Sequence, residues 1–482
     1  MREFKKLVPD VKIILGAAVF LLAAAGLFVA FIGPWPVYKN SGFATSAYCR
    51  KALADIDKSI ALSDFTATPG SLQAGWGAAK MTPKVGTVMR GVMDPDGSRI
   101  ATAVRDDLYS KAICLSDGKD TVALIGTDIL MVTSNIAEMA RRKIAAQVGL
   151  PAKNILFSAS HTQTGPGAFA PGLFWTVGFG KLDPVVTEQV STAMADAVVA
   201  AYRSMAPARL ADCHVDAPEF IFNYMHNAAT DSMLKFLVVE KLTGEKCFVI
   251  RYSAHPSNFE RYPDCQKRIS AEYPGALQRC VEAETKGMAI YVAGATGCML
   301  PKPPKAPGPD ERVELMGREL AKKMLDSLAA SPPQFKTNLD IASMGVPIGM
   351  PSTELRMVSP AFRASPLLLG FVGIRAEGWI QSIRVGDILF IGLPFDVSGE
   401  IARQWCGEVA PKGWDLWLDG FSGAYCGYLS PDKYYFVDGL TYESGTMGWT
   451  GPDAEAYMRT LRDKIVAKMG ELSLRAQNGA PT

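Results

Sequence analysis

An uncharged apolar run near the N-terminus constrains this chain more than any other feature. Residues Ile13 to Ile32 include no charged side chain, and about 20 such residues have the length of a helix that crosses a bilayer. A cleaved signal peptide has a shorter apolar core, of about 7–15 residues, followed by a small-residue cleavage site. No good site follows Ile32, so the run predicts an uncleaved transmembrane anchor over residues 13–32.

The residues that flank this run predict its orientation. The preceding segment, residues 1–12, carries four basic side chains: Arg2, Lys5, Lys6 and Lys12. Because positive residues favour the cytoplasmic side, we expect a single-pass protein with a cytoplasmic N-terminus and a periplasmic or extracellular main domain. Trp35 and Tyr38 are expected at the far interface. Residues 33–71 are interpreted as a juxtamembrane linker with a short helix at about residues 47–60.

The remaining chain is large enough to bury a substantial core. The whole protein has 482 residues, of which 48% are hydrophobic. It has 50 basic and 48 acidic residues, which leave a net charge of +2. No cluster of basic residues interleaved with aromatic ones is present, which excludes the usual surface for nucleic acid. The nine cysteines form no Cys-x-x-Cys pair, which argues against a structural zinc site. Their pairing and the oligomeric state stay open.

Buried strands alternate with amphipathic helices along most of the chain. The pattern predicts strands at 122–125 and 154–158, and helices at 135–148, 184–205 and 311–329. This alternation is typical of an α/β domain with a substantial sheet. We assign residues 72–475 to that domain and residues 476–482 to a tail.

One strand ends in residues suited to chemistry. The apolar residues Ile155 to Phe157 are followed by small hydroxyl residues, then His161, then a Gly-Pro-Gly turn at residues 165–167. A strand of this kind delivers polar side chains to the edge of a sheet, where α/β domains commonly bind ligands. A lone histidine can also merely satisfy a turn, so the interpretation depends on the residues that accompany His161.

Several short blocks resemble, in order, the catalytic domain of the neutral/alkaline ceramidase family. They lie at residues 75–83, 126–128, 160–167, 254–256, 269–275, 294–301, 392–396, 424–428 and 442–443. The resemblance implies mixed sheets sandwiched between helices and a zinc-dependent hydrolase that cuts the N-acyl bond of ceramide. It also implies a membrane lipid, ceramide-like or another N-acyl lipid, as the partner. An anchor suits such an enzyme, because tethering raises the effective concentration of a substrate that resides in the bilayer.

The residues at the family's zinc-ligand positions depart from its pattern. The family uses two histidines, a glutamate and a tyrosine, and these positions correspond to Arg105, Gln163, Asp396 and Tyr428. A guanidinium stays protonated and an amide oxygen is a weak zinc donor, so the first two substitutions imply a degraded zinc site. The family's active-site serine also falls in a turn, residues 297–301, that contains no serine.

Three functions remain open from the sequence. The first is a lipid amide hydrolase with a rebuilt metal site, whose candidate ligands are His161, His255, Asp128, Asp396, Tyr428 and Glu400. The second is an inactive lipid-binding or scaffolding relative, in which Arg105 replaces the metal's charge through Asp106 or Asp396. The third is a hydrolase or acyltransferase with Cys298 as nucleophile, activated by His161 or His255 and oriented by Asp128, Asp396 or Glu272. Two other features have no place in these three hypotheses. His214 and His226 match no family ligand.

The apolar segment 357–372 is either the lid of an acyl-chain tunnel or an ordinary buried strand and turn.

Overall fold

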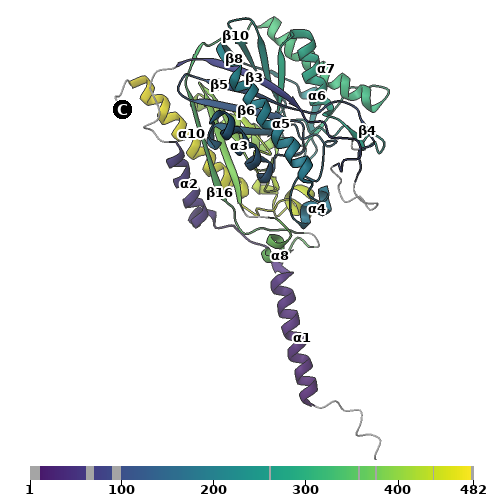
Figure 1. Ribbon diagram of the computed structural model, residues 1–482. Coiled ribbons are helices and arrows are strands. Elements are labelled where there is room, and N and C mark those ends of the chain that lie inside the picture. Colours follow the sequence, from purple (N-terminus) through teal and green to yellow (C-terminus); the bar gives the residue numbers. More distant parts are fainter. Residues whose placement is uncertain are drawn as a thin grey trace, which may run out of the picture.

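Two mixed β-sheets packed face to face form the centre of this protein. The structure, a computed structural model, describes residues 11–60, 70–89, 99–259, 262–356, 359–374, 377–437 and 439–478. Helices cover the outer face of each sheet (Figure 1). The predicted fold class, an α/β domain with mixed sheets between helices and one apolar helix before it, is confirmed. The basic residues Arg2, Lys5 and Lys6 and the end of the predicted tail, 479–482, lie outside the described residues.

The larger sheet has eight strands and the smaller has four. In spatial order the larger comprises β13 (Met288–Ala293), β11 (Lys246–Tyr252), β10 (Met233–Lys241), β8 (Ala206–Asp216), β3 (Gln73–Lys80), β5 (Tyr109–Ser116), β6 (Thr121–Thr127) and β7 (Ile155–Ala159). The smaller comprises β16 (Ile341–Gly349), β18 (Glu377–Val385), β19 (Ile388–Gly392) and β21 (Asp415–Asp419). Three neighbouring pairs are parallel: β6 with β7, β11 with β13, and β19 with β21.

The burial of both sheet faces explains the continuous apolar runs in the strands. In β6 and β7, Leu124 and Leu156 point toward the smaller sheet and share a core with Phe390 and Trp417. Their neighbours point the other way, and Phe157 packs in the core beneath the outer helices. Because successive side chains face opposite sides of a strand, a strand covered on both sides is apolar at most positions.

The helices divide between the two outer faces. Those that pack on the larger sheet are α3 (Ser134–Val148), α5 (Pro184–Arg203), α6 (Glu272–Thr285) and α7 (Pro309–Ala330). Those that pack on the smaller sheet are α2 (Ala47–Ser59), α9 (Gly399–Val409) and α10 (Ala454–Asn478). The helices predicted at 135–148, 184–205 and 311–329 therefore correspond to α3, α5 and α7.

The N-terminal helix projects away from the domain, whereas the segment after it packs against the domain. Helix α1 (Val11–Phe31) projects from the body (Figure 1) and is long and apolar enough to cross a membrane, a property that signal sequences share. The following residues, predicted as a linker, lie against the domain: β1 (Trp35–Pro36) pairs with β17 (Phe362–Arg363), and α2 buries Cys49, Ala52 and Ile56 on the smaller sheet. The stretch 61–69 of the predicted linker lies outside the described residues.

The larger sheet curls until its two edges approach each other. Its halves join through only two residue pairs between β3 and β8, and the Ala293 N–H at the end of β13 donates to Ser158 Oγ in β7 at 2.9 Å. Gly126 in β6 makes this approach possible, because a Cβ atom there would overlap the backbone carbonyl oxygen of Tyr291 in β13. The carboxyl ends of β6, β7, β11 and β13 are thereby brought together.

We expect Gly126→Ala to destabilise the fold. The added methyl group must push β13 away from β6, and overpacking of this kind costs about 1–3 kcal/mol. Thermal unfolding of the purified full chain would measure the loss. Gly407→Ala is the matched control, because Gly407 lies in α9 with no atom within 4 Å of the place that the new methyl group would take, and Ala in a helix is favoured over Gly by about 1 kcal/mol. Equal melting temperatures for the two variants would contradict the role given to Gly126.

Candidate functional site

The candidate site lies where the ends of parallel strands converge. His161 follows β7, His255 follows β11, and Cys298 follows β13. The fourth contributor, Asp396, comes from the segment after β19, where β20 (Asp396–Val397) pairs with β22 (Tyr428–Leu429). The carboxyl ends of the strands in both sheets thus supply one cluster of polar side chains, as the position of His161 in the sequence predicts.

The orientation of His161 is determined by a backbone carbonyl group. Its Nδ1 atom lies 2.6 Å from Leu130 O, and because a carbonyl oxygen only accepts, Nδ1 carries the proton and Nε2 presents a lone pair. That Nε2 atom lies 2.9 Å from Nε2 of His255. Two imidazole nitrogen atoms that face each other so closely must share one proton or one cation.

A buried carboxylate completes the cluster. Asp396 is 2% exposed, its Oδ1 accepts a hydrogen bond from Thr296 Oγ1 at 3.1 Å, and the Tyr428 hydroxyl donates to it as well. Burial raises the pKa of Asp396 to about 7, although these two hydrogen bonds oppose the shift. Ligand atoms of His161, His255 and Asp396 all lie within 4.8 Å of one another.

This donor set fits a zinc ion. Two imidazoles and one carboxylate are the ligands of many catalytic zinc sites, and two nitrogen ligands on a tetrahedral zinc lie about 3.3 Å apart, which requires only a small separation of the two rings. Gln163, which the sequence resemblance predicts at a ligand position, is also buried beside them: its Nε2 atom lies 3.4 Å from His255 Nε2. Its Oε1 atom is buried without a hydrogen-bond partner among the described residues, so it is available as a further donor.

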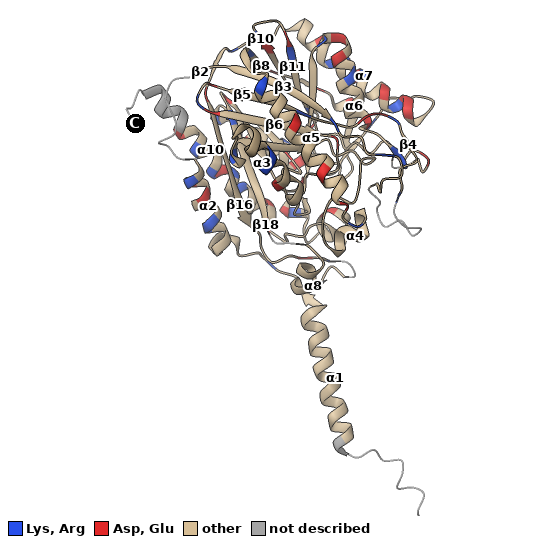
Figure 2. Ribbon diagram, viewed as in Figure 1, with Lys and Arg blue, Asp and Glu red and all other residues tan. Residues whose placement is uncertain are grey.

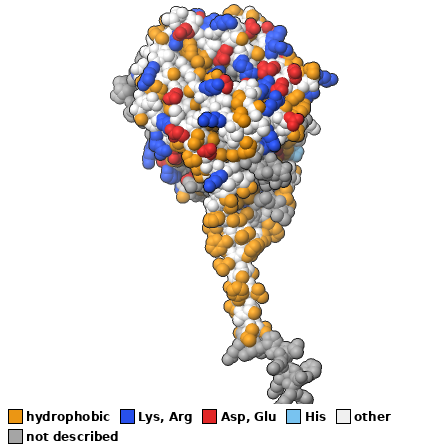
Figure 3. Space-filling model, turned by 45° about the vertical axis from the view of Figure 1, so that its right-hand side comes forward, with side chains coloured by type: hydrophobic (Ala, Val, Ile, Leu, Met, Phe, Trp, Pro, Cys, Tyr) orange, Lys and Arg blue, Asp and Glu red, His pale blue; other side chains and the backbone are white. Residues whose placement is uncertain are grey.

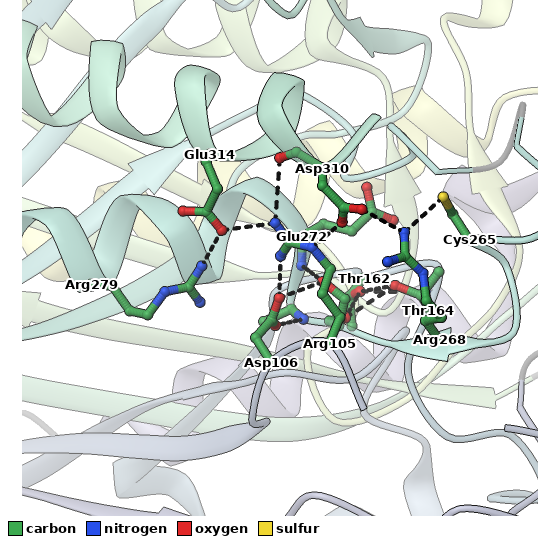
Figure 4. Close-up of polar contacts among 12 residues, drawn as sticks. Arg105, Asp106, Thr162, Thr164, Cys265, Arg268, Glu272, Arg279, Asp310 and Glu314 are labelled. Carbon is green, nitrogen blue, oxygen red and sulfur yellow. Dashed lines mark hydrogen bonds and ion pairs between the residues drawn. The ribbon is translucent and has the colours of Figure 1, made fainter. Parts of the chain in front are cut away.

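Arg105, which the sequence resemblance aligns with a zinc-binding histidine, lies in a network of ion pairs. Figure 4 shows its guanidinium among acidic side chains: Nε donates to Asp310 Oδ1 at 2.5 Å, Nη2 to Glu314 Oε1 at 2.8 Å, and Nη1 pairs with Asp106. Asp106 in turn accepts the Ala271 N–H at 2.6 Å, just before α6. The contact with Asp106 is therefore present. In the described residues no ion pair joins Arg105 to Asp396, so Arg105 ties the start of α7 to the loop before α6.

Cys298 lies beside the cluster. It is 3% exposed and has a left-handed backbone with φ of 65°, and the carbonyl oxygen of the next residue, Met299, accepts the His255 N–H at 2.7 Å. Burial first, and then the charges of Asp396 and Cys298, raise the pKa of Tyr428 well above its usual range. All nine cysteines fall within the described residues, and none forms a disulfide bond.

The other predicted acidic candidates have different partners. Asp128 Oδ2 accepts the Tyr109 N–H at 2.9 Å, and burial raises its pKa to about 6. Glu272 Oε2 accepts the Asn258 N–H at 2.7 Å. Glu400 pairs with Lys433. In the part of the chain that the structure describes, the group able to hold a metal comprises His161, His255 and Asp396. Asp128, Glu272 and Glu400 do not belong to it.

Sequence reasoning did not identify Phe421. Its ring stacks on that of His161, with 4.0 Å between ring centroids and 12° between planes, and its backbone is left-handed with φ of 57°. His161 and Cys298 share this backbone conformation, which is costly for residues other than glycine and gathers at functional sites. The available signal is a turn with two glycines, Gly420 and Gly423, directly after the buried strand β21.

The same turn begins with a fully buried carboxyl group, which predicts a pH effect. Burial raises the pKa of Asp419 to about 8, while nearby Arg251 lowers it. The unfolded chain has the ordinary aspartate pKa of about 4. At a pH between about 4 and about 8, Asp419 therefore keeps its proton in the folded state and loses it in the unfolded state. Stability should therefore fall by about 1.4 kcal/mol for each pH unit gained. We expect Asp419→Asn to remove this contribution, measured as the difference between variant and wild-type unfolding curves from pH 5 to 8. A difference that does not change with pH would contradict it.

Comparison with known proteins supports the fold. Neither a protein-family model nor a curated protein matches the chain. Among solved structures, the chain is similar to the neutral ceramidase from Pseudomonas aeruginosa, with a TM-score of 0.72 and 16% identity over 84% of this chain and 75% of that one. It is also similar to a ceramidase complexed with C2, with a TM-score of 0.68 and 14% identity over 84% of this chain and 76% of that one. The resemblance found in the sequence is confirmed at the level of the fold.

Proposed function

We propose that this chain, which has the neutral ceramidase fold, is a metal-dependent hydrolase of N-acyl lipids. The observation that carries the proposal is the convergence of His161, His255 and Asp396, whose ligand atoms lie within 4.8 Å of one another. Two imidazoles and a carboxylate suit zinc, and we take zinc as the metal because the similar fold belongs to neutral ceramidases. The sphingolipid ceramide and other N-acyl lipids are the substrates implied by the similar structures.

The proposed site differs from the family's own ligand set. Only Asp396 and Tyr428 occupy family ligand positions with residues that bind zinc, and His161 and His255 take over from the missing histidines. His255 is positioned through its backbone, because its N–H donates to Met299 O. The metal site is therefore rebuilt from residues that the same strand ends supply.

The chain's own residues define the chemistry available. A bound zinc ion supplies Lewis-acid polarisation of a water or carbonyl oxygen. Leu130 O holds the tautomer of His161 that keeps Nε2 deprotonated. Thr296 and Tyr428 hold the carboxylate of Asp396. The pKa of Tyr428 is raised by burial, so its hydroxyl keeps its proton and continues to donate it to Asp396. Buried surroundings strengthen each of these interactions.

The location of the substrate fits an anchored enzyme. In this proposal α1 stays in the bilayer, with the N-terminus in the cytoplasm and the α/β domain on the periplasmic or extracellular side. The substrate then resides in the membrane that holds the enzyme, which raises its effective concentration.

Metal analysis of the purified full chain, prepared without chelator, is the first test. About one equivalent of zinc, together with release of fatty acid from ceramide or another N-acyl lipid, supports the proposal. Absence of both metal and turnover would overturn it in favour of a lipid-binding or scaffolding relative, in which the ion pairs of Arg105 hold the domain together.

A second candidate function is a Cys298-dependent hydrolase or acyltransferase. The backbone N–H of His255 donates to Met299 O, and this contact favours the second candidate because it brings the segment with the thiol beside the segment with an imidazole, the kind of base that activates a cysteine. In that case Cys298→Ser and a thiol-alkylating reagent should each reduce turnover at least 100-fold. Under the metal proposal, Cys298→Ser should retain both zinc and most of the turnover.

A further inference from the structure

An exposed apolar surface lies beside the end of α1. It consists of Leu173 and Val177 on α4 (Leu173–Phe179), Phe362 on β17, and Leu367 and Phe371 on α8 (Pro366–Phe371), and we call it the α4–α8 surface. Each of these side chains is exposed, and Phe371 is 84% exposed. Figure 3 shows hydrophobic side chains gathered on the part of the domain nearest α1. Contiguous apolar surface of this kind marks an interaction site.

This surface is held at a defined level relative to α1. The Ser365 N–H donates to Ile32 O at 2.9 Å and its hydroxyl donates to Ala30 O at 2.7 Å, so α8 begins directly at the last turn of α1. Helix α4 is held beside it, because the Phe174 N–H donates to Val372 O at 2.8 Å. Where α1 leaves a membrane, the α4–α8 surface must therefore lie at the level of the membrane surface (Figure 1).

The two segments that form most of this surface carry no charge. Residues 165–180 and 364–374 contain no Asp, Glu, Lys or Arg. Figure 2 shows charged residues concentrated on α2, α6, α7 and the far end of the domain instead. Contact with the headgroup and acyl boundary of a bilayer would cost little here, because no charge of these segments has to leave water. The segment 357–372, predicted as a lid or as a buried strand and turn, thus contains exposed residues of this surface; Met357 and Val358 lie outside the described residues.

Aromatic side chains connect this surface with the candidate site. On the inner side of α4, Trp175 contacts Tyr425 with 6.1 Å between ring centroids. Tyr425 stacks on Phe421 at 6.1 Å, and Phe421 stacks on His161 at 4.0 Å. Trp175 and Phe421 are buried, so these rings form a packed connection between α4 and the histidine pair.

We infer that the α4–α8 surface contacts the bilayer that holds α1. The inference rests on the membrane anchorage in the proposed function. The occupant is a lipid surface, because the patch is apolar, continuous with the end of an apolar helix, and held in place by that helix. Tilting of the domain away from the membrane is limited by the two Ser365 hydrogen bonds.

Photo-crosslinking of the full chain in phosphatidylcholine vesicles tests this contact. p-Benzoylphenylalanine would be introduced in place of Phe371, Leu173 or Leu242, one at a time. Leu242 is the matched control: it is 69% exposed and apolar, and it lies in the turn between β10 and β11. Figure 1 shows β10 at the end of the domain remote from α1. We expect lipid adducts, detected by mass spectrometry, at least tenfold more abundant at positions 371 and 173 than at 242.

The other outcomes are informative in different ways. Adduct levels at 371 and 173 equal to those at 242, or adducts with a second copy of the chain, would overturn the inference. The same probe at Phe20, which is 72% exposed in α1, reports separately on the anchor, so loss of lipid adducts there would reject the anchor itself. Lipid adducts at 371 from a chain that hydrolyses no N-acyl lipid would reject the hydrolase and keep the membrane contact.

Discussion

Replacing His161 with alanine is expected to empty the metal site and to abolish hydrolysis of N-acyl lipids. Nε2 of this residue faces His255 Nε2 at 2.9 Å, and no third imidazole of the described residues belongs to the group of ligand atoms. Loss of a residue that hydrogen-bonds to a metal ligand typically lowers the affinity for the metal about 10–100-fold. Loss of a ligand itself should therefore lower it more. Zinc content should fall from about one equivalent to less than a tenth, and turnover should fall at least 100-fold.

Two further variants make this result interpretable. His214→Ala removes an imidazole on β8 that lies outside the group of ligand atoms and should leave zinc content and turnover unchanged. Asp396→Glu keeps a carboxylate at that position and should retain zinc, whereas Asp396→Ala should lose it. If His161→Ala keeps a full equivalent of zinc and folds with an unchanged melting temperature, the metal is bound elsewhere and the proposed site is wrong.

Removal of the buried guanidinium at Arg251 is expected to have the largest effect on stability. This side chain is fully buried; its Nη2 donates to Asp231 Oδ2 at 2.8 Å and to Leu418 O at 3.1 Å. Arg251→Met would leave Asp231 as a buried, uncompensated carboxylate beside the equally buried Asp419. Breaking a buried ion pair from one side costs about 3–5 kcal/mol. Chemical denaturation of the purified chain measures this loss.

An exposed ion pair provides the comparison. Arg209 is 42% exposed at its side chain and pairs with Glu240 at 2.8 Å, so Arg209→Met should cost less than about 1 kcal/mol. Arg251→Met combined with Asp231→Leu should recover part of the lost stability, because the second change removes the uncompensated charge. A cost for Arg251→Met as small as that for Arg209→Met would show that water or another group compensates Asp231.

The amino-acid sequence determined the features that depend on local pattern. The apolar run at residues 13–32 corresponds to α1, and the apolar stretches at 122–125 and 154–158 correspond to β6 and β7. These features follow from the length and period of hydrophobic residues, which are properties of neighbours in the chain. The order of short motif blocks was enough to predict the sandwich of mixed sheets between helices, which the similar structures support.

Only the tertiary structure decided which residues form the site. His161 and His255 are 94 residues apart in the chain, and their contact depends on how the larger sheet curls and on the register of β7, β11 and β13. For the same reason Arg105 lies in an ion-pair network, and Phe421, from the other sheet, stacks on His161. Distances between strand ends are set by packing across both sheets, and no local period in a sequence encodes them.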